Sequence, residues 1–560
     1  MEKIADFIRG YDISYIDGTS RRTYCTISAS AAAYSALVVS FSFVYKTVHS
    51  HRLLTSFIAF LVLFFTFFCL VSFAARLLAN GRGFKVYEKK LEFSWQRFSI
   101  IFVLLATPLV VGYLYWFPGI HNLDTIDQWR QVTSFSFNDW HPALHSILIW
   151  LLSRVSESYA FVILIQNILF CYALTFMYTT LERWGIPTGL LAVVFGSIVL
   201  TPETQTFMQI LHKDGAFSIA AIVLTTMIID IYLCNGGVKR HQIIALGVLS
   251  GVTTLLRHNG FFFTVPLITV LVAMYWKRRY IRYIAPVFIL TVLAIRFPIY
   301  SAFNVNYPNN AIGESVGWPM VVMGDIYVFD PMSIDDETRA FLLSYAGDNM
   351  WQEKYQPGDF DSIKWEVEEN YELLNDTPLM QYISMAMRSA VKNPVIAFEA
   401  IRQLTASVWN ISDEFNLYMY PNRELLEGIL EYEAIISLSD YTTPGFIESY
   451  IRPPLFLPLV FVPRVLLLNI GMRLLGMIFC FAAAFPRNGR RSYILVLPSV
   501  LYCFCTMPIL ASPGQQRIFH FVLAISFPIC ILLLASKKGA EELHNQTGSM
   551  RTVPEVSNVE

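Results

Sequence analysis

Residues 98–117 read FSIIFVLLATPLVVGYLYWF and contain no charged side chain. A helix rises about 1.5 Å per residue, so a run of this length can span the roughly 30 Å hydrocarbon core of a bilayer. Similar apolar runs recur along most of the 560-residue chain, of which 55% is hydrophobic and only 15% is charged. This composition predicts an all-α, multi-spanning transmembrane helix bundle and excludes a series of ordinary soluble domains.

Twelve apolar runs are predicted to cross the membrane, and two of them, at 187–200 and 243–256, are short for a span. The twelve lie near residues 25–45, 55–77, 98–117, 158–181, 187–200, 216–234, 243–256, 260–276, 283–300, 465–485, 493–511 and 518–536. Lys and Arg are concentrated in alternate connections, which the positive-inside rule assigns to the cytoplasm. Both termini are then cytoplasmic, and the outer connections are 118–157, 201–215, 257–259, 301–464 and 512–517.

The same pattern divides the chain into five parts. They are 1–97, with the cytoplasmic N-terminus, two spans and a basic cytoplasmic loop; 98–300, a transmembrane module whose first outer loop is 118–157; 301–464, an acidic extracytoplasmic domain; 465–536, the last spans; and 537–560, a cytoplasmic tail. Helix-start patterns at 333–336, 377–378 and 393–394 predict that the outer domain is mostly helical.

The net charge and the positions of the cysteines exclude some classes of function. The formal net charge is −1, so no basic field indicates a nucleic-acid partner. The eight cysteines lie in or beside apolar runs and none lies within 301–455, which excludes a disulfide framework in the outer domain. Membrane enzymes, transporters and receptors remain.

Polar and charged residues gather at the predicted outer membrane boundary. The first outer loop supplies two acids, an amide and two histidines: Asp124, Asp127, Gln128, His141 and His145. Such residues are solvated in most outer loops, but Asp124 comes immediately after a span. His141 and His145 are four residues apart, so we expect them to share a helix face directed toward that acid. The two acids are three residues apart, so in a helical segment they would share a face, where one would raise the pKa of the other.

Three cations lie at the same predicted level. They are Lys213, Arg257 and Arg517. The polar residue Asn259 lies two positions after Arg257. One arginine can be a simple anchor and Lys213 can be neutralised by Asp214 next to it. Three together favour an anionic ligand, because the guanidinium fork binds two phosphate oxygens. Glu203 and Asp214 are candidates to join the loop acids around a divalent cation, and a metal-free site is equally compatible.

An acid and several cations at a lipid-facing boundary suggest a lipid-phosphate substrate. In transfer from a polyprenyl-phosphate sugar, a carboxylate takes the proton from the acceptor. Positive groups stabilise the departing phosphate. The bilayer, the donor and an acceptor glycan, lipid or protein would be the partners.

The motifs extend this hypothesis to a family. They are Pro118-Gly119, Asp124-Thr125, Gln128, Asn138 to Pro142 with His145, Lys213-Asp214, Arg257 to Gly260 and Arg517. They resemble the pattern of an uncharacterised bacterial family of multi-spanning proteins, which is similar to a branch of the GT-C membrane glycosyltransferases. The resemblance implies a GT-C-like module that begins at 98–117 and an aspartate base in the first outer loop. Asp124 holds the matching position, with Asp127 as its competitor.

Two other classes stay open. A transporter or flippase of a lipid-linked molecule would place ionisable residues near the midplane, often within inverted repeats. A receptor or scaffold would need the outer domain but not the acid and its cations. The one-sided cluster and the lack of a visible repeat favour the glycosyltransferase.

Overall fold

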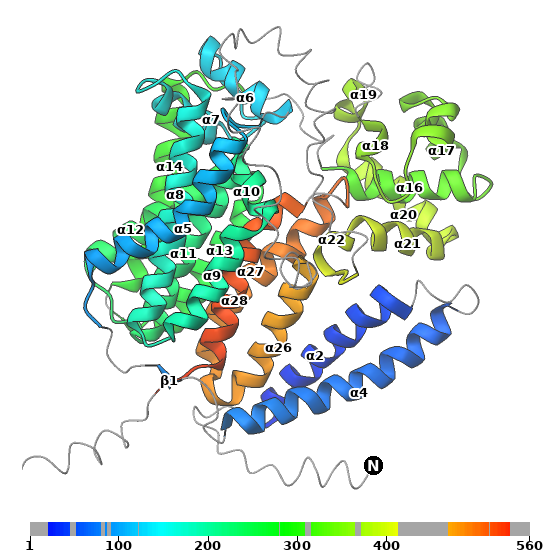
Figure 1. Cartoon of the computed structure of the whole chain (residues 1–560). Coiled ribbons are helices and arrows are strands. Elements are labelled where there is room, and N and C mark those ends of the chain that lie inside the picture. Colours follow the sequence, from blue (N-terminus) through cyan, green and yellow to red (C-terminus); the bar gives the residue numbers. More distant parts are fainter. Residues whose placement is uncertain are drawn as a thin grey trace, which may run out of the picture.

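The computed structural model describes residues 21–44, 52–79, 85–86, 91–120, 123–278, 280–307, 315–364, 371–412, 469–513 and 516–537. Almost all regular structure in this part of the chain is helical (Figure 1). The strands described are β1 (Lys85–Val86) and β2 (Ser536–Lys537), which pair in parallel. The all-α prediction is therefore confirmed.

Nine helical stretches in the described ranges are long and apolar enough to cross a membrane, which indicates a multi-pass membrane protein. The helices that form them are α2 (Arg21–Val39) with η1 (Ser40–Val44), α4 (Arg52–Ala79), α5 (Trp95–Tyr115), α8 (Tyr159–Arg183), α11 (Lys213–Leu233), η2 (His258–Gly260) with α13 (Phe261–Tyr275), η3 (Ile281–Tyr283) with α14 (Ile284–Ala294), η4 (Ile295–Ile299) and α15 (Tyr300–Ala302), α26 (Ile470–Asn488) with η11 (Gly489–Ser492), α27 (Tyr493–Thr506) and η12 (Met507–Ile509), and η13 (Gln516–Phe519) with α28 (His520–Leu534).

The difference from twelve predicted spans has two causes. The runs at 187–200 and 243–256 form α9 (Thr188–Leu200) and α12 (Arg240–Leu256), which contain 13 and 17 residues. At about 1.5 Å per residue, α9 covers only about 20 Å. The stretch that includes α26 and α27 is continuous but turns at Gly489, whose φ of 64° favours glycine.

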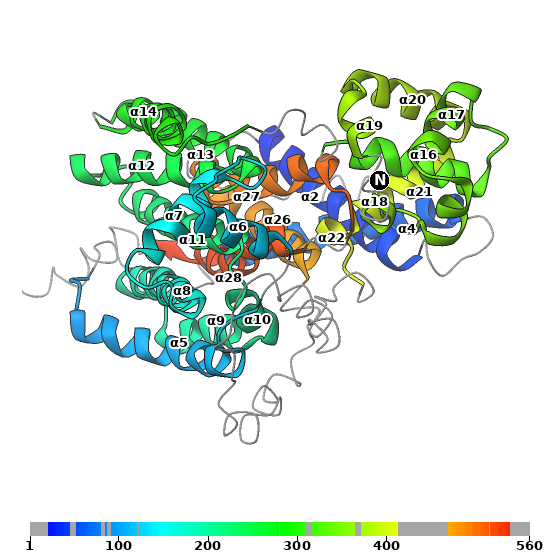
Figure 2. The ribbon, with the colours of Figure 1, turned by 90° about the horizontal axis from the view of Figure 1, so that it is seen from above.

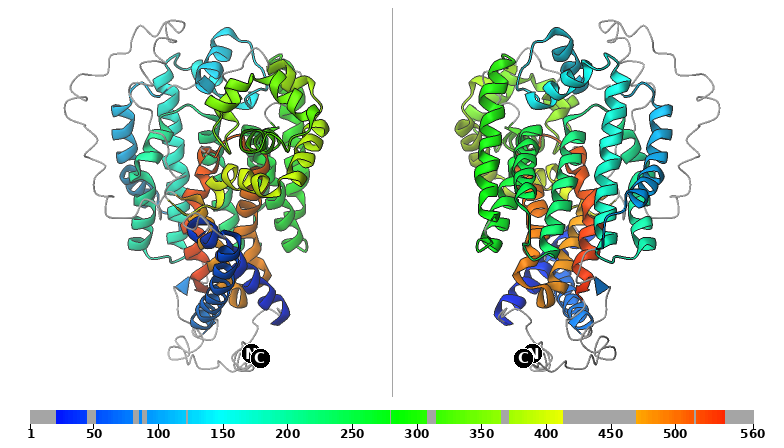
Figure 3. Two further views of the ribbon diagram at one scale, coloured as in Figure 1. Left: turned by 90° about the vertical axis from the view of Figure 1, so that its right-hand side faces the viewer. Right: turned by 90° about the vertical axis from the view of Figure 1, so that its left-hand side faces the viewer.

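Most of the long helices form one bundle. Helix α8 packs against α5 and α11, and α11 packs against α12 and α28. Helices α2 and α4 pack against each other and against α26, and form a hairpin beside this bundle (Figures 1 and 3). The hairpin corresponds to the two additional N-terminal spans that the sequence separates from the rest.

A group of shorter helices forms a separate body beside the bundle (Figure 2). Helix α16 (Gly317–Phe329) packs against α20 (Leu379–Lys392) and α21 (Pro394–Leu404). The remaining helices are α17 (Asp336–Tyr345), η6 (Met350–Lys354), α18 (Asp361–Lys364), α19 (Tyr371–Asp376) and α22 (Ala406–Trp409). We call this body the helical domain.

The predicted helix starts in this domain are confirmed. Asp335 caps α17 by accepting a hydrogen bond from the Thr338 backbone N–H at 2.8 Å. Helix α20 begins directly after Pro378, and α21 begins at Pro394. The final part of the predicted domain, residues 413–464, and the tail from 538 lie outside the described residues.

Candidate functional site

Short helices cover one end of the bundle, where the predicted polar residues lie. Helix α6 (Leu123–Ser134) carries Asp124 in its first turn, and α7 (Ala143–Ser153) follows (Figures 1 and 2). Lys213 and Asp214 open α11, whose N-cap is His212. Arg257 directly follows α12, and Arg517 lies in η13 ahead of α28.

The Asp124 carboxylate lies among two cations and two histidines. Its Oδ2 is 2.6 Å from Nε2 of His212 and 3.2 Å from Nζ of Lys213. Nη2 of Arg517 is 3.5 Å from the same oxygen, and Nε2 of His141 is 3.8 Å from Oδ1. The residues come from the first outer loop, the start of α11 and η13, which are far apart in the sequence, so tertiary folding brings them together.

The surrounding charges keep Asp124 ionised. Burial alone would raise its pKa, but the charge of Lys213, the hydrogen bond with His212 and the charge of Arg517 outweigh burial and hold the pKa well below its usual range. Burial and the neighbouring Lys213 lower the pKa of His141 to about 3. His141 is therefore neutral at pH 7, and its Nδ1 accepts a hydrogen bond from Nζ of Lys213 at 2.9 Å.

A second carboxylate, that of Asp214, continues the cluster into the bundle. Asp214 forms an ion pair with Arg257, and both side chains are buried. Nδ1 of His212 is 2.9 Å from Oδ2 of Asp214, and Nε of Arg517 is 3.8 Å from that oxygen. Two carboxylates thus face the cations of Lys213, Arg257 and Arg517, which leaves one positive charge in excess. Lys213, Arg257 and Arg517 therefore lie around these two carboxylates, and their convergence on one phosphate stays a prediction.

The two acids of α6 do not act together. The segment is helical, but Asp127 accepts a hydrogen bond from Nε2 of Gln131 at 2.7 Å. The pKa of Asp124 is lowered and not raised, because cations from other segments surround it.

The expectation that the two histidines share a helix face was wrong. His141 precedes Pro142, and a residue before proline is disfavoured in helical conformation, so α7 begins only at 143. His141 reaches Asp124 from the loop. His145, inside α7, instead has its Nδ1 3.2 Å from Oε1 of Gln128, whose Nε2 donates to Ser146 at 3.4 Å.

The predicted metal ligands do not assemble. Among the described residues no group of three or more His, Cys, Asp or Glu side chains is arranged to hold a metal ion. Asp214 is paired with Arg257, and Glu203 is buried on α10 (Pro202–Met208). Asn259 lies in η2, and the described ion pairs of Asp124 and Asp214 do not involve it.

Sequence reasoning missed His212. It immediately precedes the Lys213-Asp214 pair, and its ring lies between the carboxylates of Asp124 and Asp214. A histidine next to two predicted site residues at a helix start was the available signal. The pairing with Asp124, 88 positions away, was not visible in the pattern.

Asp139 anchors the loop that carries His141. Its Oδ1 accepts a hydrogen bond from the Ala143 backbone N–H at 3.0 Å, and its Oδ2 accepts one from Nη1 of Arg296 at 2.7 Å. The Asp139 backbone N–H also donates to the carbonyl of Asn306 at 2.9 Å. The carboxylate therefore satisfies the start of α7 and ties the loop to the span before the helical domain.

Replacing Asp139 by alanine should lower the free energy of unfolding by about 1–3 kcal/mol, because a helix-start acceptor and a partner of Arg296 are lost. The thermal unfolding midpoint of the purified protein in detergent checks this. Asp127→Ala is the matched control, since that carboxylate bonds to Gln131 within its own helix. Equal midpoints for the two variants would contradict the anchoring role.

Comparison with known proteins places the chain in a family. No curated protein and no solved structure matches it. The model of DUF6020, a family of unknown function, matches residues 136–420, just over half of the chain. The matched range contains His141, Lys213 and Arg257 and excludes Asp124 and Arg517. The chain therefore belongs to the DUF6020 family.

Proposed function

We propose that this chain is a membrane glycosyltransferase that moves a sugar from a polyprenyl-phosphate donor to an acceptor at the outer face of the membrane. One observation carries the proposal. An ionised carboxylate, Asp124, lies within direct reach of Lys213 and Arg517 at one end of an apolar helix bundle. This arrangement offers a base and a phosphate site side by side.

The charges suit a phosphate. The cluster has one cation more than carboxylates, and arginine and lysine both bind phosphate oxygens. In the described arrangement Lys213 and Arg517 contact Asp124 directly. A donor phosphate that took over these two cations would offset two causes of the low pKa of Asp124, the charges of Lys213 and Arg517, and would leave the hydrogen bond with His212 in place. The carboxylate would then be a stronger base when the donor is bound.

The proposed step is a direct displacement at the anomeric carbon. The acceptor hydroxyl or amine gives its proton to Asp124 as its heteroatom bonds to that carbon. The bond from the carbon to the phosphate oxygen breaks, and the electron pair leaves with the phosphate. Lys213 and Arg517 stabilise the charge that develops there. The sugar passes through a transition state of oxocarbenium character.

The proposal includes a GT-C-like architecture and an orientation. Each of the twelve predicted runs overlaps a helix in the described residues, and the basic residues of alternate connections predict that both termini are cytoplasmic. The site and the helical domain then face outward, where lipid-linked sugars would be delivered. The first two spans, α2 and α4, are an addition to the module that begins at α5.

Donor binding tests the site before any acceptor is known. Arg517→Ala in lipid nanodiscs should weaken binding of a polyprenyl-phosphate sugar by roughly tenfold to a hundredfold, since a charge-assisted hydrogen bond is lost. Arg517→Lys should fall between, because it keeps the charge and loses the fork. Titration calorimetry or a labelled donor measures both.

The matched control is Arg130→Ala, which removes an exposed arginine from α6, the helix that carries Asp124. Its affinity should equal that of the unaltered protein. Equal affinities for all variants would remove Arg517 from the site. Donor binding with no transfer to any acceptor, and with movement of the lipid between leaflets, would instead favour the flippase.

A further inference from the structure

The helical domain exposes an apolar stripe along α20 and α21. Its members are between 44% and 76% exposed, and they are Met380, Met387, Val391, Val395 and Phe398. Successive residues of a helix are about 100° apart, so Met380, Met387 and Val391 fall on one side of α20, and Val395 and Phe398, three residues apart, fall on one side of α21. We call these five residues the apolar stripe.

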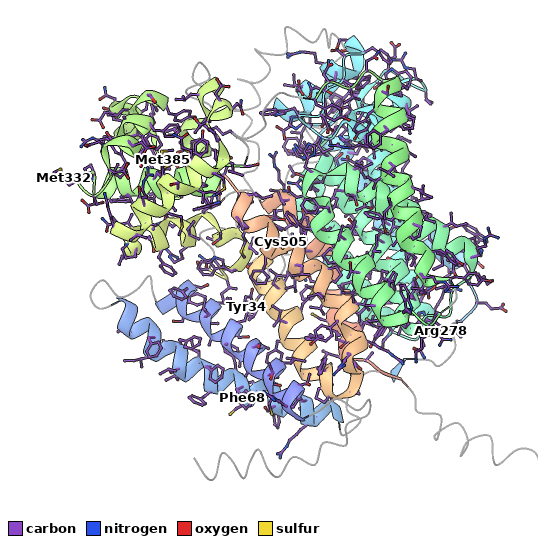
Figure 4. All side chains as sticks on the ribbon, turned by 180° about the vertical axis from the view of Figure 1, so that it is seen from behind. Tyr34, Phe68, Arg278, Met332, Met385 and Cys505 are labelled. Carbon is purple, nitrogen blue, oxygen red and sulfur yellow. The ribbon has the colours of Figure 1, made fainter. Side chains whose placement is uncertain are left out.

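The apolar stripe is not part of the domain core. The core side of α20 is formed by Tyr382, Met385, Ala386 and Ser389, which are buried where α20 packs against α16. Figure 4 shows Met385 inside the domain, whereas Met332 stands at its outer edge. Helix α20 is therefore apolar on two opposite sides, and the second side needs another partner.

The stripe adjoins the end of a membrane-spanning stretch. The ring of Phe398 lies 5.5 Å, between centroids, from the ring of Phe41 in η1, at the end of the first membrane-spanning stretch. The Ile411 backbone N–H also donates to Oγ of Ser42 at 3.1 Å. Figure 1 shows α20 and α21 on the side of the domain nearest to α2 and α4. Next to these contacts, Phe43 is 48% exposed on the membrane-spanning stretch.

Two basic side chains lie along one edge of the stripe on α20. Arg388 and Lys392 lie about 80° and 120° around α20 from Met380, at about 100° per residue. Both residues are exposed. Arg388 is held by Glu337 at 2.7 Å and Asp335 at 3.4 Å. An apolar stripe with basic residues beside it is typical of helices that lie in the membrane interface.

We infer that α20 and α21 rest on the bilayer surface, with the apolar stripe at the boundary between lipid headgroups and acyl chains. The occupant of this surface is phospholipid. The end of a membrane-spanning helix fixes the height of Phe398, and the stripe extends from that point. This inference is independent of the proposed transfer reaction.

Seating the domain on lipid would also affect the site. The Phe360 backbone N–H donates to the carbonyl of Ala511 at 2.9 Å, and Oγ of Ser512 donates to Oδ2 of Asp359 at 3.1 Å. These contacts join the helical domain to the segment that leads into η13 and Arg517. A domain held on the membrane would therefore hold that segment in place.

A fluorescent coumarin amino acid placed at Met387 in the full-length protein tests the inference. The protein is reconstituted into phosphatidylcholine vesicles, with and without nitroxide-labelled phosphatidylcholine. We expect strong quenching by the lipid nitroxide and weak quenching by aqueous iodide, because the probe would lie at acyl-chain depth. A second probe at Val391 should behave in the same way.

The matched control is the same probe at Ser344, an exposed position on α17 in the same domain. It should show the reverse pattern, with iodide quenching dominant. Iodide quenching at Met387 equal to that at Ser344 would overturn the inference, because the stripe would face water. Weak quenching by both agents would also overturn it, since protein, from a second copy or another segment of this chain, would then cover the stripe.

Discussion

Asp124→Asn should nearly abolish sugar transfer while the protein still folds and binds its donor. The substitution keeps the shape of the side chain and removes its basicity, and loss of a general base typically lowers the rate by about 10²–10⁴-fold. Asp124 is the carboxylate that lies beside Lys213 and Arg517, the proposed phosphate ligands. Single-turnover transfer by purified protein in lipid measures the loss.

The affinity of Asp124→Asn for its donor should not fall together with the transfer rate. Asp124 now neutralises part of the charge of Lys213 and Arg517, so its removal leaves a more positive site. Affinity for the phosphate donor should stay equal or rise in Asp124→Asn. The control is Asp127→Asn, whose carboxylate bonds to Gln131 instead, and which should change transfer much less.

Two results would contradict the assignment. Near-full transfer by Asp124→Asn would mean that the base is another residue, with Asp127 the first alternative. Loss of donor binding together with activity would mean that Asp124 organises the cations rather than accepting a proton.

Asp214→Ala should produce the largest loss of stability. Asp214 is 1% exposed and is paired with Arg257, which is also buried. Removing one partner of a buried ion pair leaves an uncompensated charge, which typically destabilises by about 3–5 kcal/mol. The thermal unfolding midpoint in detergent should fall clearly, and the yield of folded protein should fall with it.

An exposed ion pair supplies the control. Glu337→Ala breaks the ion pair with Arg388. The Arg388 side chain is 43% exposed and the Glu337 side chain is 59% exposed. Such pairs contribute about 0–1 kcal/mol, so the midpoint should barely move. The double variant Asp214→Ala with Arg257→Leu removes both buried charges and should recover part of the loss. A double variant no more stable than Asp214→Ala would show that the unpaired charge is not the cause.

Local patterns were sufficient to predict much of the fold. Apolar runs located the spans because each helix in a bilayer must satisfy its own backbone hydrogen bonds and face lipid or other helices. The starts of α17, α20 and α21 followed from an N-cap acid and two prolines, whose effects act within a few residues. Helix α16 was not anticipated. It is an apolar segment shorter than a span, and its buried position depends on α20 and α21 packing over it.

The sequence predicted which residues belong to the candidate site but not which of them pair with each other. The sequence by itself placed Asp124, Lys213, Arg257 and Arg517 at one membrane level, because each lies at the end of an apolar run and run length fixes depth. It indicated a charged, anion-suited end of the bundle. Run length carries no information about rotation or neighbours, so it could not assign partners.

Tertiary structure decided those partners. In the folded chain Lys213, His212 and Arg517 contact Asp124, whereas Asp127 bonds to Gln131. Tertiary structure also paired Asp214, a candidate metal ligand, with Arg257. The physical reason is that side-chain pairing depends on distances of about 3 Å between segments separated by up to hundreds of residues. Only the packing of the whole bundle, which brings the ends of α6, α11, α12 and η13 together, fixes distances on that scale.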